Sequence, residues 1–118
     1  MTSIDTAKIR ELNDAFRATT TSMIGSWIGS GQLVVTRGVA SHGTDFLNRA
    51  VAAVRAFSDF TPDNDPYDEH EFGAFDVECE RLMWKIDYYD PNFEYGSADP
   101  ANVLKTRRVL TILLAEEY

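Results

Sequence analysis

The sequence predicts an α+β domain in which a small antiparallel sheet of about three strands packs against two or three helices. Apolar residues recur at helical spacing in residues 3–18 and 45–57. In residues 75–89 they alternate with polar residues, which is the period of a half-buried strand. With 118 residues, the chain has the length of one domain with one core, so we expect residues 1–118 to form a single domain.

The first helix is predicted over residues 3–18. Ile9, Leu12 and Phe16 fall on one apolar stripe, with Ala15 beside them, while charged residues take the other side. This pattern is typical of a surface helix that turns one face to the core.

A loop, a strand and a second helix are expected to follow. The threonines and glycines of residues 19–31 indicate a loop, in which Trp27 is either packed on the core or exposed as an anchor for a partner. Residues 32–37 are rich in β-prone residues and predict a strand. The second helix is predicted over residues 45–57, with Thr44 as its N-cap.

Residues 75–89 predict a β-hairpin. Phe75, Val77 and Cys79 alternate with acidic residues, and a second strand of period 2, with Leu82, Trp84, Ile86 and Tyr88 on one face, follows a turn near residues 78–81. This pattern places Cys79 in mid-strand on an apolar face, where a buried thiol is inert.

The last element is predicted as a helix over residues 100–117. Asp99 at the N-cap and Pro100 at the first helical position are typical of a helix start. Apolar residues then recur at a spacing that suits a buried helical face. The pair Thr111-Ile112 leaves an extended strand open as the alternative.

Acidic residues are concentrated in one part of the chain. The net charge is -8, but residues 57–99 carry thirteen acidic side chains against Arg81 and Lys85, so this segment has a net charge of -11. Such a field repels nucleic acids and anionic membranes and attracts a basic protein surface. We therefore expect no direct binding to nucleic acid or membrane.

The composition indicates a cytoplasmic protein. No apolar run approaches the roughly 18 residues that span a bilayer, and the N-terminus lacks the pattern of a signal peptide. The single cysteine allows no internal disulfide, which fits a reducing compartment.

The acidic loop over residues 63–71 raises the question of a metal site. Asp68 stands where an EF-hand loop needs glycine, so only a looser Ca²⁺ or Mg²⁺ site stays open. Zinc bound by His42, His70 and a carboxylate is a further alternative, although structural zinc usually has four nitrogen or sulfur ligands. A histidine in such a loop more often bonds a carbonyl or an acidic neighbour. We therefore expect no metal and no other cofactor.

Six blocks of the chain are distinctive: Leu12–Arg17, Val35–Val39, Asn64–Tyr67, Glu69–Gly73, Trp84–Asp90 and Arg107–Tyr118. In this order they resemble the bacterial family catalogued as domain of unknown function 3768. The family is uncharacterised, so the resemblance implies no catalytic residues. It implies instead a relation to the small accessory genes of plasmids and prophages. The chain departs from the family pattern in a longer segment over residues 19–31.

We interpret the sequence as a small acidic, non-enzymatic protein that binds and inhibits a nucleic-acid-handling protein of host defence. An anti-CRISPR or anti-restriction protein that acts partly as a DNA mimic is the concrete form of this hypothesis. The acids would imitate a phosphate backbone, and an aromatic side chain would anchor in a basic groove. The expected partner-binding residues are Asp63, Asp65, Tyr67, Asp68, Glu69, Glu71, Glu78, Glu80 and Trp27.

Two other hypotheses stay open. The first is a metal-dependent or acid/base hydrolase that uses His70 with Asp65 or Asp87 and has a concave site. The chain contains no Gly-x-Ser-x-Gly motif and no phosphate-binding glycine loop, so we expect no enzyme of those classes. The second is a structural accessory subunit, which would expose an apolar patch.

Overall fold

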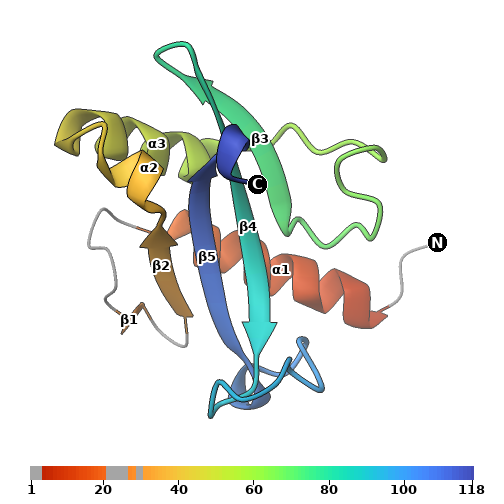
Figure 1. Cartoon of the computed structure of the whole chain (residues 1–118). Coiled ribbons are helices and arrows are strands. Elements are labelled where there is room, and N and C mark those ends of the chain that lie inside the picture. Colours follow the sequence, from red (N-terminus) through yellow and green to blue (C-terminus); the bar gives the residue numbers. More distant parts are fainter. Residues whose placement is uncertain (1–3, 21–26, 29–30) are drawn as a thin grey trace.

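The computed structural model describes residues 4–20, 27–28 and 31–118 and contains a mixed sheet in the order β1-β2-β5-β4-β3 (Figure 1). The strands are β1 Trp27–Ile28, β2 Gly31–Val35, β3 Phe72–Val77, β4 Glu80–Tyr89 and β5 Arg107–Leu114. The helices are α1 Ile4–Ala18, α2 Arg37–Ala40 and α3 Thr44–Ala56, with the short 3-10 helices η1 Val103–Lys105 and η2 Ala115–Glu117. The predicted α+β class is confirmed. Four strands of five to ten residues and the two-residue β1 replace the three strands expected.

The sheet is mixed because its first long strand pairs with its last. β3 and β4 are antiparallel, and so are β4 and β5. β2 lies parallel to β5, with Gly31 opposite Arg108 and Val35 opposite Ile112. In β1, the backbone of Trp27 pairs with Gln32 of β2. The side chain of Trp27 lies outside the described part of the chain.

The main error of the sequence prediction concerns residues 100–117, which do not form a helix. Residues 107–114 are the middle strand of the sheet, and Arg108, Leu110 and Ile112 are buried on one face. The apolar residues of this segment satisfy the helical period and the strand period alike. The strand forms because β2 and β4 supply hydrogen-bonding partners on both of its edges, which no local pattern reveals.

One face of the sheet packs against α1 and α3, which lie behind it in Figure 1. Trp84 at the centre of β4 is fully buried and is the largest side chain of the core. Phe57 and Phe60, from the end of α3 and the loop after it, pack edge-on against the Trp84 ring. Among the described helices, none is long and apolar enough to cross a membrane.

α1 turns a different face to the core than its apolar stripe predicts. Ile9 and Phe16 are buried as expected, but Ala15 is exposed. Two polar residues of this helix, Asn13 next to the stripe and Arg17 from the charged side, are 0% and 5% exposed. A helix can bury such groups only when they find hydrogen-bonding partners.

Arg17 finds its partners at the C-terminal end of α3. Its guanidinium donates hydrogen bonds to the carbonyl oxygens of Val54 and Phe57, at 3.0 and 2.6 Å. These carbonyls lie where a helix leaves its acceptors unsatisfied and its dipole favours a cation. Arg17 therefore joins the two helices on the core side of the sheet.

The segment between β2 and α3 differs from the predicted strand and cap. β2 ends at Val35, and Thr36 caps the short α2 by accepting a hydrogen bond from the backbone N–H of Val39. Thr44 is the first residue of α3 rather than its N-cap. The N-cap is Gly43 at φ 93°, a backbone conformation that glycine adopts without strain.

The β3–β4 hairpin is confirmed, including the position of its turn. Val77 pairs with Glu80, so Glu78 and Cys79 form a two-residue loop. Both have positive φ, 50° and 69°, as a type I′ turn requires. Cys79 is therefore exposed at the tip of the hairpin, and the prediction of a buried mid-strand thiol is wrong.

Candidate functional site

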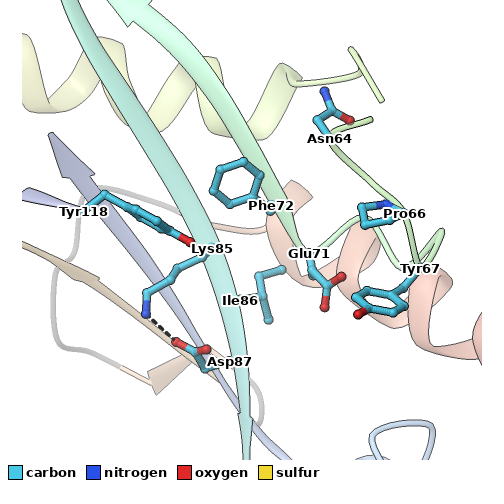
Figure 2. A pocket seen from close by; sticks show the side chains of 9 residues that line it. All are labelled: Asn64, Pro66, Tyr67, Glu71, Phe72, Lys85, Ile86, Asp87 and Tyr118. Atoms are coloured by element: carbon cyan, nitrogen blue, oxygen red, sulfur yellow. Dashed lines mark ion pairs between the residues drawn. The ribbon is translucent and has the colours of Figure 1, made fainter. Parts of the chain in front are cut away.

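A groove of about 370 Å³ opens beside the C-terminal part of β4, where β3 begins. Figure 2 shows the side chains that line it: Asn64, Pro66, Tyr67, Glu71, Phe72, Lys85, Ile86, Asp87 and Tyr118. The loop over residues 59–71 forms one wall. Because side chains alternate along a strand, Lys85 and Asp87 point away from the helix-covered face that buries Trp84 and Ile86.

The loop that forms this wall is held by its own polar groups. Asp65 is buried, and its Oδ1 accepts hydrogen bonds from the backbone N–H groups of Glu69 and His70, both at 3.1 Å. The Asn64 side chain bonds the backbone of Thr61 at 2.8 Å. These are Asx-type turn interactions, which explain why acids and amides gather in this segment. Asp65 thus has a structural role and presents little surface to a partner.

His70 lies inside the loop rather than in the groove. Its Nδ1 is 2.9 Å from Asp14 Oδ1, and its Nε2 is 3.6 Å from Asp65 Oδ2. Its ring stacks on Phe60, with a centroid separation of 3.7 Å. This histidine has the acidic neighbours that the sequence analysis expected for a structural histidine.

The described residues offer one group with metal-ligand character, formed by Asp65, Asp68 and His70 within 4.8 Å of one another. Each member is already engaged inside the protein. Asp68 bonds Arg10 at 2.7 Å, and the other two have the partners given above. His42 lies instead next to Glu80, at the opposite end of the hairpin, so it does not join His70 in a zinc site.

A buried polar network lies behind the loop, and the sequence analysis missed it. Asn13 donates hydrogen bonds to the Tyr88 hydroxyl at 2.7 Å and to the Glu69 carbonyl at 2.9 Å, and accepts one from Arg108 Nε at 2.7 Å. The Tyr88 hydroxyl donates to Glu69 Oε1 at 2.9 Å. Burial raises the pKa of Tyr88 and lowers that of Arg108. Arg108 belongs to this network, but the sequence analysis assigned its segment to a helix rather than to β5. The predicted helix did not place Arg108 next to Asn13.

Among the residues that line the groove, Glu71 has the most strongly shifted pKa. Burial raises its pKa to about 7 from the ordinary 4.5. Repulsion from the carboxylates of Glu69, Asp65 and Asp87 adds to the effect. The cation beside them, Lys85, pairs with Asp87 at 3.2 Å. Negative charge therefore accumulates in the groove without full compensation.

Two aromatic rings stand exposed at the groove. Tyr67 is 72% exposed and Tyr118 is 79% exposed, and they stand on opposite sides of the groove (Figure 2). Asp63 is exposed on the same loop as Tyr67. The predicted residues Asp63, Tyr67 and Glu71 are thus accessible together, while Tyr118 was not predicted because the sequence analysis placed it after a helix.

The predicted acids of the hairpin turn lie elsewhere. Glu78 is paired with Arg49 of α3, Glu80 lies 3.6 Å from His42, and the neighbouring Asp76 is paired with Arg81. β3 has six residues, and a strand rises about 3.3 Å per residue, so the turn lies about 20 Å from the groove. The structure does not bring Glu78 and Glu80 together with the acids of the loop.

A second exposed feature lies between β4 and β5. It consists of the large apolar side chains Phe93, Tyr95, Val103 and Leu104, of which Leu104 is 85% exposed. Polar groups fix this connection: Thr106 Oγ1 donates to the Asp99 carbonyl at 2.9 Å. We call these four residues the apolar tip.

Comparisons with known proteins identify a family and no function. A family model described as "Protein of unknown function (DUF3768)" matches residues 35–117, which is more than half of the chain. The block Leu12–Arg17 lies outside that range. No curated protein and no solved structure matches the chain. The chain belongs to the DUF3768 family.

Proposed function

We propose that this protein is a non-enzymatic inhibitor that acts in the cytoplasm by binding the basic surface of a nucleic-acid-handling protein. A defence effector of the CRISPR or restriction type is the proposed target. The observation that carries the proposal is the groove, where carboxylates outnumber the one lysine and two tyrosine rings are exposed. Rings of this kind and uncompensated charge are what a basic protein surface binds.

The geometry divides the proposed mimicry into two contributions. The groove concentrates negative charge at a point with aromatic anchors, so it is proposed as the main contact. The acids of the turn are matched by Arg49, Arg81 and His42, so they add little to the net negative field and are not proposed as contacts. A partner that normally binds nucleic acid would be occupied by the groove and attracted by the field of the net charge of -8.

A capture experiment tests this function. The protein is used as bait in a bacterial lysate, and the bound proteins are released with increasing salt. We expect a basic nuclease or effector subunit, and we expect double-stranded DNA added to the purified pair to compete with the bait. Inhibition of that subunit's activity by stoichiometric bait completes the test.

Charge-reversal variants make the test specific. Glu71→Lys changes the groove, and Glu94→Lys, at an exposed acid between β4 and β5, is the matched control. We expect the groove variant to lose capture while the control retains it. Capture that is insensitive to all of these changes and to salt contradicts the proposal.

An acid/base enzyme is the second candidate, and one observation favours it. A carboxyl group with a pKa near 7 in an open groove has the protonation behaviour of a general acid or base. This candidate uses Glu71 rather than His70. Hydrolysis of model ester or phosphate substrates that disappears in Glu71→Gln, and follows a pH profile centred near neutrality, would favour it over the inhibitor.

A further inference from the structure

We propose that the groove is a recognition site for an arginine side chain, with the guanidinium held between Glu71 and Asp87 and against the Tyr67 ring. This inference rests on the proposed function, because it names the group of the partner that enters the site. It commits to one occupant, a guanidinium on a protein segment.

The shape of the groove fits a long side chain with a planar head. Its volume of about 370 Å³ is at the small end of the range for ligand sites. Tyr67 and Phe72 line it together with the methylene-rich Lys85, so an aliphatic stem has apolar surface to cover. Figure 2 shows the Glu71 carboxylate beside the Tyr67 ring, which places an anion and an aromatic face next to each other.

Negative charge exceeds positive charge around the groove, so one more cation would be bound favourably. Glu71 and Asp87 line it, and the carboxylates of Asp65, Glu69 and Asp87 all raise the pKa of Glu71. Lys85 opposes them and is itself bound to Asp87 at 3.2 Å. The Tyr88 hydroxyl donates to Glu69 and stays neutral. An incoming cation therefore removes a repulsion that the free protein retains.

Arginine suits this arrangement better than lysine. The guanidinium is planar, donates two parallel hydrogen bonds to one carboxylate, and stacks on an aromatic face. An ammonium group can do only one of these at a time, and Lys85 already supplies one in the groove. Arginine-rich segments are also a common feature of surfaces that bind nucleic acid.

Binding should depend on pH through Glu71. A cation prefers the ionised carboxylate, and the raised pKa of Glu71 places its ionisation near neutrality. The affinity for a guanidinium should therefore rise between about pH 6 and about pH 8. An exposed carboxylate of ordinary pKa is ionised across this range and gives no such change.

A peptide titration followed by NMR tests the inference on the full chain. The probes are tetra-arginine, tetra-lysine and tetra-citrulline, the last being a neutral isostere of arginine. We expect tetra-arginine to bind most tightly, tetra-lysine more weakly and tetra-citrulline not at all. The shifted resonances should be those of Tyr67, Glu71 and Asp87.

Variants separate the groove from general acidity. Glu71→Gln should weaken tetra-arginine by about tenfold at pH 8 and remove the pH dependence. Lys85→Met should strengthen it, since it frees Asp87. Glu94→Gln, which removes an exposed acid outside the groove, should change little. Equal losses in Glu71→Gln and Glu94→Gln, or shifts spread over all acids, would overturn the inference.

The two proposals fail in different ways. If tetra-arginine binds in the groove but no nucleic-acid-handling protein is captured and inhibited, the arginine site stands and the proposed function fails. If such a protein is captured and groove variants leave its binding unchanged, the proposed function stands and the arginine site fails. The amide spectrum of each variant, compared with that of the parent chain, identifies a change that results from loss of folding.

Discussion

The two ends of the β3–β4 hairpin carry similar numbers of acids in opposite electrostatic settings. At the turn, Glu78 and Asp76 each have an arginine partner, and Glu80 lies next to His42. At the other end, Glu71 faces further carboxylates, and the lysine that lines the groove, Lys85, is paired with Asp87. The number of acidic residues in a segment is therefore a poor guide to its electrostatic potential. The fold neutralises the acids at the turn and brings those at the groove close together. Four predictions test this contrast.

The largest effect is expected from Asn13→Ala, which breaks the network behind the groove. The change leaves the buried Arg108 and the Tyr88 hydroxyl without their shared partner. Buried groups that lose their hydrogen bonds cost about 2–4 kcal/mol of unfolding free energy in such a case. Urea denaturation measures the loss. Asn48→Ala, at an exposed position of α3, is the control and should cost almost nothing.

Glu71→Gln should stabilise the protein, with a gain that begins above about pH 4.5 and is complete above about pH 7. The pKa of Glu71 is about 7 in the folded protein against 4.5 ordinarily, so the folded state binds this proton more tightly. Stability is then fully present below about pH 4.5 and is lost as the pH rises through 7. After allowance for solvent screening, the gain at pH 8 is about 1–2 kcal/mol.

Thermal melts of Glu71→Gln and of the parent chain at pH 4.5 and pH 8 decide this prediction. The two curves should coincide at the lower pH and separate at the higher one. A variant that melts below the parent chain at pH 8 would show that the Glu71 carboxylate is compensated after all.

At the turn, Arg49→Ala should have a smaller effect in the opposite direction. Arg49 and Glu78 are both largely exposed, and an exposed ion pair contributes about 0.5 kcal/mol, less at high salt. Urea denaturation at low and high salt measures it, with the exposed Arg55→Ala as control. A loss comparable to that of Asn13→Ala would remove the contrast between the two ends.

An effect of similar size to that of Arg49→Ala, but stabilising, is expected at the tip of the hairpin. Cys79 has a φ of 69°, which glycine adopts more readily, so Cys79→Gly should stabilise the turn by about 0.5 kcal/mol. Cys79→Ser retains the β carbon and should give no gain. The exposed thiol of the parent chain should also react with a thiol reagent without unfolding.

The parts of the fold that follow from local pattern were predictable. Residues 45–57 and the Phe75 and Val77 face of the hairpin show periods that burial confirms. Residues 107–114 were not predictable in this way, because their period is ambiguous and their neighbours β2 and β4 are remote in sequence. A local pattern of apolar residues shows which face of a single helix or strand is buried. The order of the strands in the sheet depends instead on which strands pair, and local patterns do not show that.

The site shows the same division. The acidic loop with Tyr67 was predicted as a surface, and the groove contains Tyr67 and Glu71. The internal use of Asp65 and the arrival of Tyr118 at the opposite wall depend on tertiary contacts. Buried Asn13 could not be distinguished from an ordinary surface residue, since its partners come from three other segments.

The parallel pairing of β2 with β5 bears on how quickly this protein folds. Gly31 meets Arg108 across the sheet, so the middle of the sheet closes only after two distant segments find each other. The entropy lost in closing so long a loop must be overcome before the contacts form. Chains dominated by such remote pairings fold in milliseconds to seconds rather than microseconds. Until β5 is in place, β2 and β4 each keep an unpaired edge, which makes this the stage most exposed to aggregation.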